Sequence, residues 1–313
     1  MDLFSHGLLG FVFGQALQLD TNVQIILIIS SVILDIDAVH TRRSVWLQFH
    51  RGPMHSLFSA TLISLAIGTT YSFLLHFSAE VFIPIFLICL GGSFSHILLD
   101  LLTPRSLAVL WPFSNEKVVF DLTSFFDPIF LGVLLPTSIF VYMVDDLSII
   151  RIVMVVANVL FALNFGVRYF ERDAAIETVK RLNVDADSKV VPLPTLRPDR
   201  WWVAVKTQSE NRYNYEIYNV DSIGNKILSH SRVESPFIDY RNLTERPTNS
   251  PQKAVAFSKR DKRVGAFIEQ SRLPAVNVTL SDDGGTWQVF WYDVFMQLSE
   301  GAFKGITIKV EID

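Results

Sequence analysis

The sequence has 313 residues, of which 50% are hydrophobic and only 19% charged, with 25 phenylalanines and a mean hydropathy of +0.34. Soluble proteins average about 25% charged residues, so this composition argues against a purely soluble fold. The net charge of −4 and the pI near 6.0 leave no basic surplus for nucleic acid phosphates, and no direct nucleic acid binding is expected. The single cysteine, Cys89, excludes an intramolecular disulfide and zinc sites built from several cysteines.

Charge is distributed unevenly along the chain. Residues 1–170 are sparsely charged and carry the whole net charge, whereas the later residues hold equal numbers of basic and acidic side chains. Six segments in the first part lack Asp, Glu, Lys and Arg, namely Leu3–Leu19, Thr21–Leu34, Ser56–Leu75, Val81–Leu99, Pro128–Val144 and Ile152–Val167. A membrane helix needs about 20 mostly apolar residues. The third and fourth segments reach that length alone, and the others reach it once a polar residue is placed at the interface.

The pattern predicts an all-α polytopic membrane domain of about six helices over residues 1–172. Lys and Arg gather in alternate connections, at Arg42, Arg43 and Arg51, then Arg105 and Lys117, then Arg168, Arg172, Lys180 and Arg181. Because basic residues favour the cytoplasmic side, both termini are expected in the cytoplasm.

The second half predicts a small soluble α+β domain with an antiparallel sheet over residues 199–313. A charged, helix-favouring stretch, Ala174–Lys189, and a proline-rich stretch, Val191–Pro198, suggest a linker over residues 173–198. Short β-branched and aromatic runs follow, separated by turn residues: Trp201–Thr207, Tyr213–Val220, Val276–Leu280, Thr286–Val294 and Gly305–Ile312. Gln252–Gln270 is richer in Ala, Lys and Arg and predicts a helix.

The strongest functional signal is a set of His and Asp residues at the ends of the apolar segments. The orientation, assigned from Lys and Arg alone, places all of them at the cytoplasmic face: His6, Asp35, Asp37, His50, His55, His96, Asp100 and Asp127. Ionisable residues at membrane depth are costly and usually functional. Their shared location therefore predicts one common site.

The spacing within this set suits metal ligands. His96 and Asp100 are four residues apart and share one helix face, and His50 and His55 flank a helix start at Pro53. Asp35 and Asp37 lie about 200° apart on a regular helix, so either the helix ends between them or only one binds the metal. Imidazole and carboxylate ligands suit zinc, with manganese or iron as alternatives. A hydrogen-bonded His96–Asp100 pair that ties two helices together is the simpler alternative.

Taken together, these motifs resemble the membrane-bound metal-dependent hydrolases of the YdjM type, some of which are described as LexA-binding inner-membrane proteins. The match runs through His6, Leu34-Asp35-Ile36-Asp37, His50-Arg51-Gly52-x-x-His55-Ser56, His96-x-x-x-Asp100, Trp111-Pro112-Phe113-Ser114 and Phe126-Asp127-Pro128. Leu34 replaces the family's usual proline. That family is in turn distantly similar to zinc-dependent phospholipase C and the S1/P1 nucleases.

The resemblance implies a multi-pass inner-membrane phosphoester hydrolase with two or three divalent ions, two being expected. A site at the cytoplasmic ends of the spans favours an amphiphilic phosphoester or related ester as the substrate. The matching metal ligands are His6, Asp37, His55, His96 and Asp100, with His50 and Asp35 binding the metal or orienting its ligands. Asp35 or Asp127 would accept a proton from water, and Arg51 would contact a phosphate oxygen or simply a membrane lipid headgroup. The alternatives are a scaffold with a structural metal whose C-terminal domain binds a regulatory protein, and a metal-ion transporter or sensor.

Overall fold

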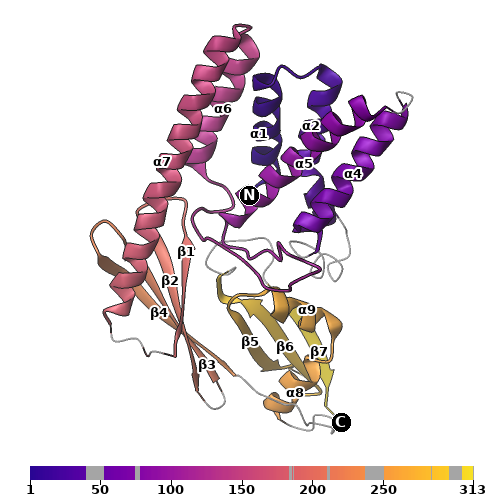
Figure 1. Ribbon diagram of the computed structural model, residues 1–313. Coiled ribbons are helices and arrows are strands. Elements are labelled where there is room, and N and C mark those ends of the chain that lie inside the picture. The colour runs from indigo at the N-terminus through magenta and orange to yellow at the C-terminus, as the bar shows by residue number, and fades with distance from the viewer. Residues whose placement is uncertain are drawn as a thin grey trace. The chain divides into compact units, whose positions relative to one another are not determined.

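The computed structural model describes residues 1–39, 53–74, 78–182, 185, 187–209, 212–236, 250–282, 284–295 and 305–312. The chain divides into two compact units, and the boundary falls inside one long helix, between Phe170 and Glu171. The N-terminal unit is helical, and the C-terminal unit contains two antiparallel sheets (Figure 1).

Each of the six predicted apolar segments forms a helix. These helices are α1 (Leu3–Ala16), α2 (Thr21–Val32), α4 (Leu57–Leu74), α5 (Ala79–Leu101), α6 (Pro128–Met143) and α7 (Leu147–Lys180). Two short 3-10 turns, η1 (Ile33–Val39) and η2 (Pro53–His55), adjoin α2 and α4. Within the described part of the chain, α4, α5 and α7 are long and apolar enough to cross a membrane, whereas the other three are shorter apolar helices.

Small residues let α1 and α5 approach α2 closely. A Cβ atom at Gly92 of α5 would lie 2.3 Å from Ser30 Oγ, and one at Gly10 of α1 would lie 2.7 Å from Ser31 Oγ. Both serine hydroxyls donate hydrogen bonds of 2.8 Å to the Leu27 carbonyl of their own helix, so they are satisfied at the interface. Such small-residue contacts are typical of helix packing in membranes. They allow the backbones of the three helices to lie close together.

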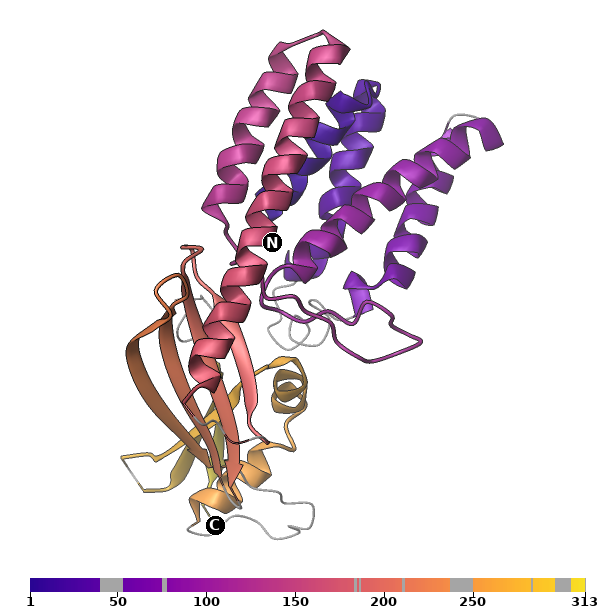
Figure 2. The ribbon, with the colours of Figure 1, turned by 60° about the vertical axis from the view of Figure 1, so that its left-hand side comes forward.

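The first sheet of the C-terminal unit has the order β1-β2-β3-β4, formed by Lys189–Pro194, Arg200–Ser209, Arg212–Asp221 and Lys226–Pro236. The second has the order β5-β6-β7, formed by Pro274–Leu280, Thr286–Asp293 and Ile306–Glu311. The last turns of α7 pack against the first sheet, as the rotated view shows (Figure 2), with Ala175 and Val179 buried beside Trp201 and Val203. Helices α8 (Pro251–Ser258) and α9 (Lys262–Gln270) bury Val255, Val264 and Phe267 against the second sheet.

The structure differs from the sequence expectation in four places here. Strand β1 occupies residues assigned to the linker; its prolines, Pro192 and Pro194, are tolerated because β1 is an edge strand. The helix expected to reach Lys189 ends at Lys180. The helix expected over Gln252–Gln270 is two helices, α8 and α9. Strand β4 was not expected, because its largely exposed, polar sequence lacks an apolar alternation.

Candidate metal centre

Four of the predicted site residues meet in the helical unit. Asp35 of η1, His55 of η2, and His96 and Asp100 of α5 each offer one ligand atom, and these atoms all lie within 4.8 Å of one another. The side chains of His55, His96 and Asp100 are fully buried, and that of Asp35 is 12% exposed. Among the described residues, no other group of three or more His, Cys, Asp or Glu side chains converges in this way.

Local structure presents these side chains from three separate segments. Helix α2 tightens into η1 after Val32, which carries Asp35 into the cluster. Pro53 begins η2, and the Ser56 hydroxyl then caps α4 by accepting a hydrogen bond of 3.1 Å from the Ser59 amide. His55 therefore lies at the end of the turn that Pro53 begins, directly before the capped start of α4. The sequence predicted a helix start at Pro53, and the structure has a 3-10 turn there followed by α4 from Leu57.

The separations of the ligand atoms suit a small cation. His55 Nε2 lies 3.2 Å from both Asp35 Oδ1 and His96 Nε2. Asp100 Oδ2 lies 3.5 Å from His55 Nε2 and 3.8 Å from His96 Nε2, and Asp35 Oδ1 lies 3.7 Å from His96 Nε2. Two atoms bound to a tetrahedral Zn²⁺ at about 2.0–2.1 Å are about 3.3 Å apart. The two nitrogens and two carboxylate oxygens thus have the chemistry and the spacing of a divalent-metal site.

A backbone carbonyl orients His96. Its Nδ1 lies 2.8 Å from the Ser31 carbonyl oxygen, to which an Nδ1–H donates a hydrogen bond. In the neutral imidazole this leaves the Nε2 lone pair directed at His55 and the two carboxylates. Metal-binding histidines are usually oriented through their second nitrogen in this way. The contact also explains why α2 and α5 must pack closely.

His6 lies beside the four converging residues. Its ring stacks on His96 with centroids 3.8 Å apart, and its Nε2 lies 3.4 Å from Asp100 Oδ1. The amine of Met1 also donates a hydrogen bond to Asp100 Oδ1. Asp100 therefore presents Oδ2 to His55 and His96, and Oδ1 to His6.

The structure does not bring every predicted residue into this cluster. His50 and Arg51 lie outside the described residues, and Asp37 lies in η1 with its side chain outside the described part. Asp127 does not act within the group of four; it caps α6, where its Oδ1 accepts hydrogen bonds from the amides of Ile129 and Phe130. Its Oδ2 accepts one from Thr123 and faces the buried Arg168 guanidinium at 3.3 Å. These contacts favour a structural role for Asp127 over the predicted proton acceptor.

The sequence analysis missed two groups that contact predicted site residues: the Ser31 carbonyl beside His96, and Arg168 beside Asp127. The Ser31 carbonyl is a backbone group, and no side-chain motif reveals it. Arg168 was counted only as an orientation signal, although a fully buried arginine inside an apolar helix is itself a sign of a specific partner.

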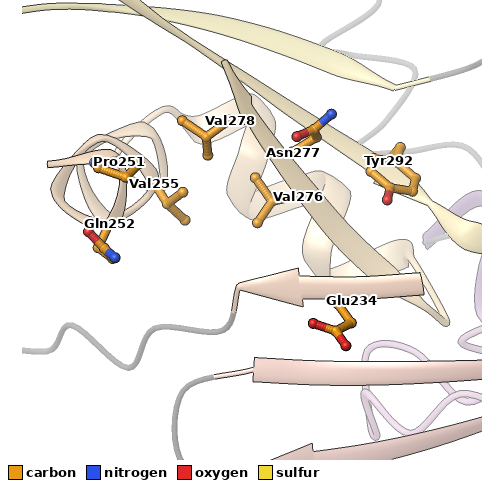
Figure 3. Close-up of a pocket in the computed structure, with 8 residues that line it drawn as sticks. All are labelled: Glu234, Pro251, Gln252, Val255, Val276, Asn277, Val278 and Tyr292. Atoms are coloured by element: carbon orange, nitrogen blue, oxygen red, sulfur yellow. The ribbon is translucent and has the colours of Figure 1, made fainter. Parts of the chain in front are cut away.

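The C-terminal unit has a cavity of about 380 Å³ between α8, β4, β5 and β6. Glu234, Gln252, Asn277 and Tyr292 are among the residues around it (Figure 3). Glu234 is the only acidic side chain among the described residues that line it, and no histidine or cysteine joins it. This cavity therefore lacks the donor set of a metal site, and the candidate metal ligands lie in the helical unit.

Comparison with known proteins identifies the helical unit. The family model described as YdjM inner membrane protein matches residues 1–174, more than half of the chain, which confirms the resemblance drawn from the motifs. No curated protein and no solved structure matches the chain, and the more distant similarity to phospholipase C and nucleases stays a prediction. The match and the apolar helices together support a membrane location. The chain therefore belongs to the YdjM inner membrane protein family.

Proposed function

We propose that this protein is a membrane-embedded, metal-dependent hydrolase of a phosphoester or related ester at the cytoplasmic face. The observation that carries the proposal is the convergence of Asp35, His55, His96 and Asp100 within 4.8 Å, from three segments of a membrane protein. A divalent ion bound there would supply Lewis acidity and make hydroxide available at neutral pH. Zinc is the first choice for two imidazoles and two carboxylates, with manganese or iron as alternatives.

The protein's own groups then divide into three tasks. His55, His96 and Asp100, all fully buried, would hold the ion and keep bulk water away from it. Asp35 is the member of the set with solvent exposure, so it is the best-placed group to take a proton from water, or to complete the ligand set. Arg51, two residues before Pro53, stays the predicted contact for a phosphate oxygen. A second ion would use His6 and Asp100 Oδ1, which face each other, and would replace the Met1 amine at that oxygen.

The proposal includes a topology of six membrane passes with both termini in the cytoplasm. It is supported by six apolar helices and by the alternation of Lys and Arg between their connections. Alkaline phosphatase and fluorescent-protein fusions after each helix test this arrangement. Phosphatase activity after α1, α4 and α6, and fluorescence after α2, α5 and α7, is the expected pattern; any other alternation refutes it.

The function is tested by measuring metal in detergent-purified protein by elemental mass spectrometry. Wild type is compared with His96→Ala and Asp100→Ala, and with His230→Ala, a half-exposed histidine of β4, as the matched control. Stoichiometric metal is expected in wild type and His230→Ala, with loss from the two cluster variants. Hydrolysis of bis-nitrophenyl phosphate and of a lipid phosphoester should follow the metal content.

Two results would overturn the proposal. Wild-type protein that stays metal-free after incubation with zinc, manganese or iron would leave the cluster as a hydrogen-bonded network between helices. Stoichiometric metal with no hydrolysis of any ester, together with lower thermal stability of the cluster variants, would identify a scaffold with a structural metal.

A further inference from the structure

The helical unit has an apolar groove of about 570 Å³ that neither the family nor the metal site explains. Side chains of α1, α2, α5, α6 and α7 line it, including Leu9, Leu87, Phe94, Phe130, Phe161 and Phe165. Its volume is in the range of small-molecule sites, about 300–1,000 Å³. Among the described residues that line the groove, none is charged.

The few polar side chains in the lining are satisfied by their own helices. The hydroxyls of Ser31 and Ser95 donate to the carbonyls of Leu27 and Gly92, both at 2.8 Å. The Asn158 amide donates to the Met154 carbonyl at 2.7 Å. The groove is therefore suited to a ligand with no polar group along its length.

The groove opens where hydrocarbon surrounds the protein. Leu87, Phe94 and Leu98 line it from α5 and are 57%, 51% and 48% exposed. Helix α5 is one of the three helices long and apolar enough to cross a membrane. The medium next to this opening is therefore lipid acyl chains.

The groove also adjoins the candidate metal centre. Ser31 lines the groove, and its carbonyl is the group that orients His96. Leu99 lines the groove, and the next residue of the chain is Asp100. Two helices, α2 and α5, thus contribute to both sites. An extended ligand lying in the groove would therefore have one end near the metal ligands.

We propose that the groove binds one acyl chain of a membrane lipid and so places that lipid's ester at the Asp35–His55–His96–Asp100 cluster. We commit to a lipid chain as the occupant because acyl chains lie next to the opening of the groove and its described lining offers no charged group. A helix of a second copy would appear in the test below as crosslinks between two copies. The acyl chain moves from the hydrocarbon of the bilayer into an apolar groove, so little hydrophobic free energy is gained. The groove therefore binds the acyl chain mainly through close packing, and it fixes the position of the lipid. The substrate assignment rests on the proposed hydrolase function, whereas acyl-chain binding does not.

The test variant is Gly91→Phe. Gly91 lines the groove, and a Cβ atom there would have no atom within 4 Å, so the backbone tolerates a side chain and a phenylalanine ring is expected to reduce the space in the groove. Gly132→Phe on α6 is the matched control, because a Cβ there also meets nothing within 4 Å and Gly132 does not line the groove. Gly91→Ala leaves the groove open and controls for the loss of glycine.

The full-length protein is reconstituted in phosphatidylethanolamine–phosphatidylglycerol vesicles with a trace of phosphatidylethanolamine that carries a diazirine at its acyl terminus. After photolysis, mass spectrometry maps the crosslinked peptides. In wild type, Gly91→Ala and Gly132→Phe, crosslinks should concentrate on Leu17 and Leu87, the groove residues farthest from His6 and Asp100 along α1 and α5. In Gly91→Phe they should be lost there while metal content and elution volume stay unchanged.

Separate readouts distinguish the two proposals. His96→Ala and metal-chelated protein should keep the crosslinks, because the groove needs no ion. If hydrolysis is real, Gly91→Phe should lose turnover of a long-chain phosphoester and keep that of bis-nitrophenyl phosphate. Crosslinks spread evenly over the outer faces of α4 and α6, equal crosslinking of the groove in Gly91→Phe, or crosslinks joining two copies of the chain would each overturn the groove proposal.

Discussion

The sequence predicted Asp127 as a proton acceptor, whereas the structure places it in a buried ion pair with Arg168. Substitutions in this pair test whether the role of Asp127 is structural or catalytic. Both side chains are fully buried, and Arg168 Nη2 lies 3.3 Å from Asp127 Oδ2. Asp127→Asn keeps the capping of α6, since asparagine is as good an N-cap as aspartate. It replaces Oδ2 with an NH2 group, so the charge and the acceptor that face Thr123 and the guanidinium are both lost, and deleting one member of a buried pair costs about 3–5 kcal/mol.

Arg168→Met should cost less than Asp127→Asn. The carboxylate of Asp127 would still accept hydrogen bonds from Thr123 and from the amides of Ile129 and Phe130. The double variant removes both charges, so its destabilisation should fall below the sum of the single ones by about 0.5–3 kcal/mol. The measurement is unfolding of the purified proteins by sodium dodecyl sulfate in mixed micelles, followed by tryptophan fluorescence.

Strict additivity would refute the ion-pair reasoning, as would an Asp127→Asn cost below about 1 kcal/mol, the value typical of an exposed pair. Metal content provides the second readout. A structural Asp127 predicts that folded Asp127→Asn protein matches wild type in metal content and in any hydrolysis. A variant with normal stability and normal metal but no activity would instead restore the proton-acceptor role.

Three further predictions concern helix packing, metal binding and the C-terminal unit. Gly92→Val should lower stability by about 1–3 kcal/mol and weaken metal binding, because a Cβ there would lie 2.3 Å from Ser30 Oγ and force α2 from α5; elemental analysis of the folded variant checks it. Chelation should lower the melting temperature of wild type, with a loss of about 2.7 kcal/mol if the ion was present at 100 times its Kd, and should leave Asp100→Ala unchanged in differential scanning calorimetry. Trp201→Ala should cost about 3–5 kcal/mol because the side chain is fully buried. Trp201→Phe should cost only about 1–3 kcal/mol, mainly for the 2.9 Å hydrogen bond to the Pro198 carbonyl, measured by denaturant titration.

The sequence by itself determined the features that depend on local pattern. Uninterrupted apolar runs located the six helices of the first unit, because a helix at membrane depth must be apolar on most of its surface. The i, i+4 spacing of His96 and Asp100 placed both on one face of α5, where they meet the same neighbours. Pro53 marked the turn that carries His55. These patterns also identified the family that the comparison confirmed.

Only the tertiary structure decided which polar residues act together. Asp35 joins the cluster because α2 tightens into η1 there, and the Ser31 carbonyl orients His96 because small residues let α2 and α5 touch. Asp127 shares the sequence signature of the cluster but is bound by a helix end and by Arg168. Likewise, β1 and β4 are strands because of their antiparallel partners rather than their own composition. Periodicity along one segment determines the face that a residue occupies, whereas its partner depends on contacts between segments far apart in the chain.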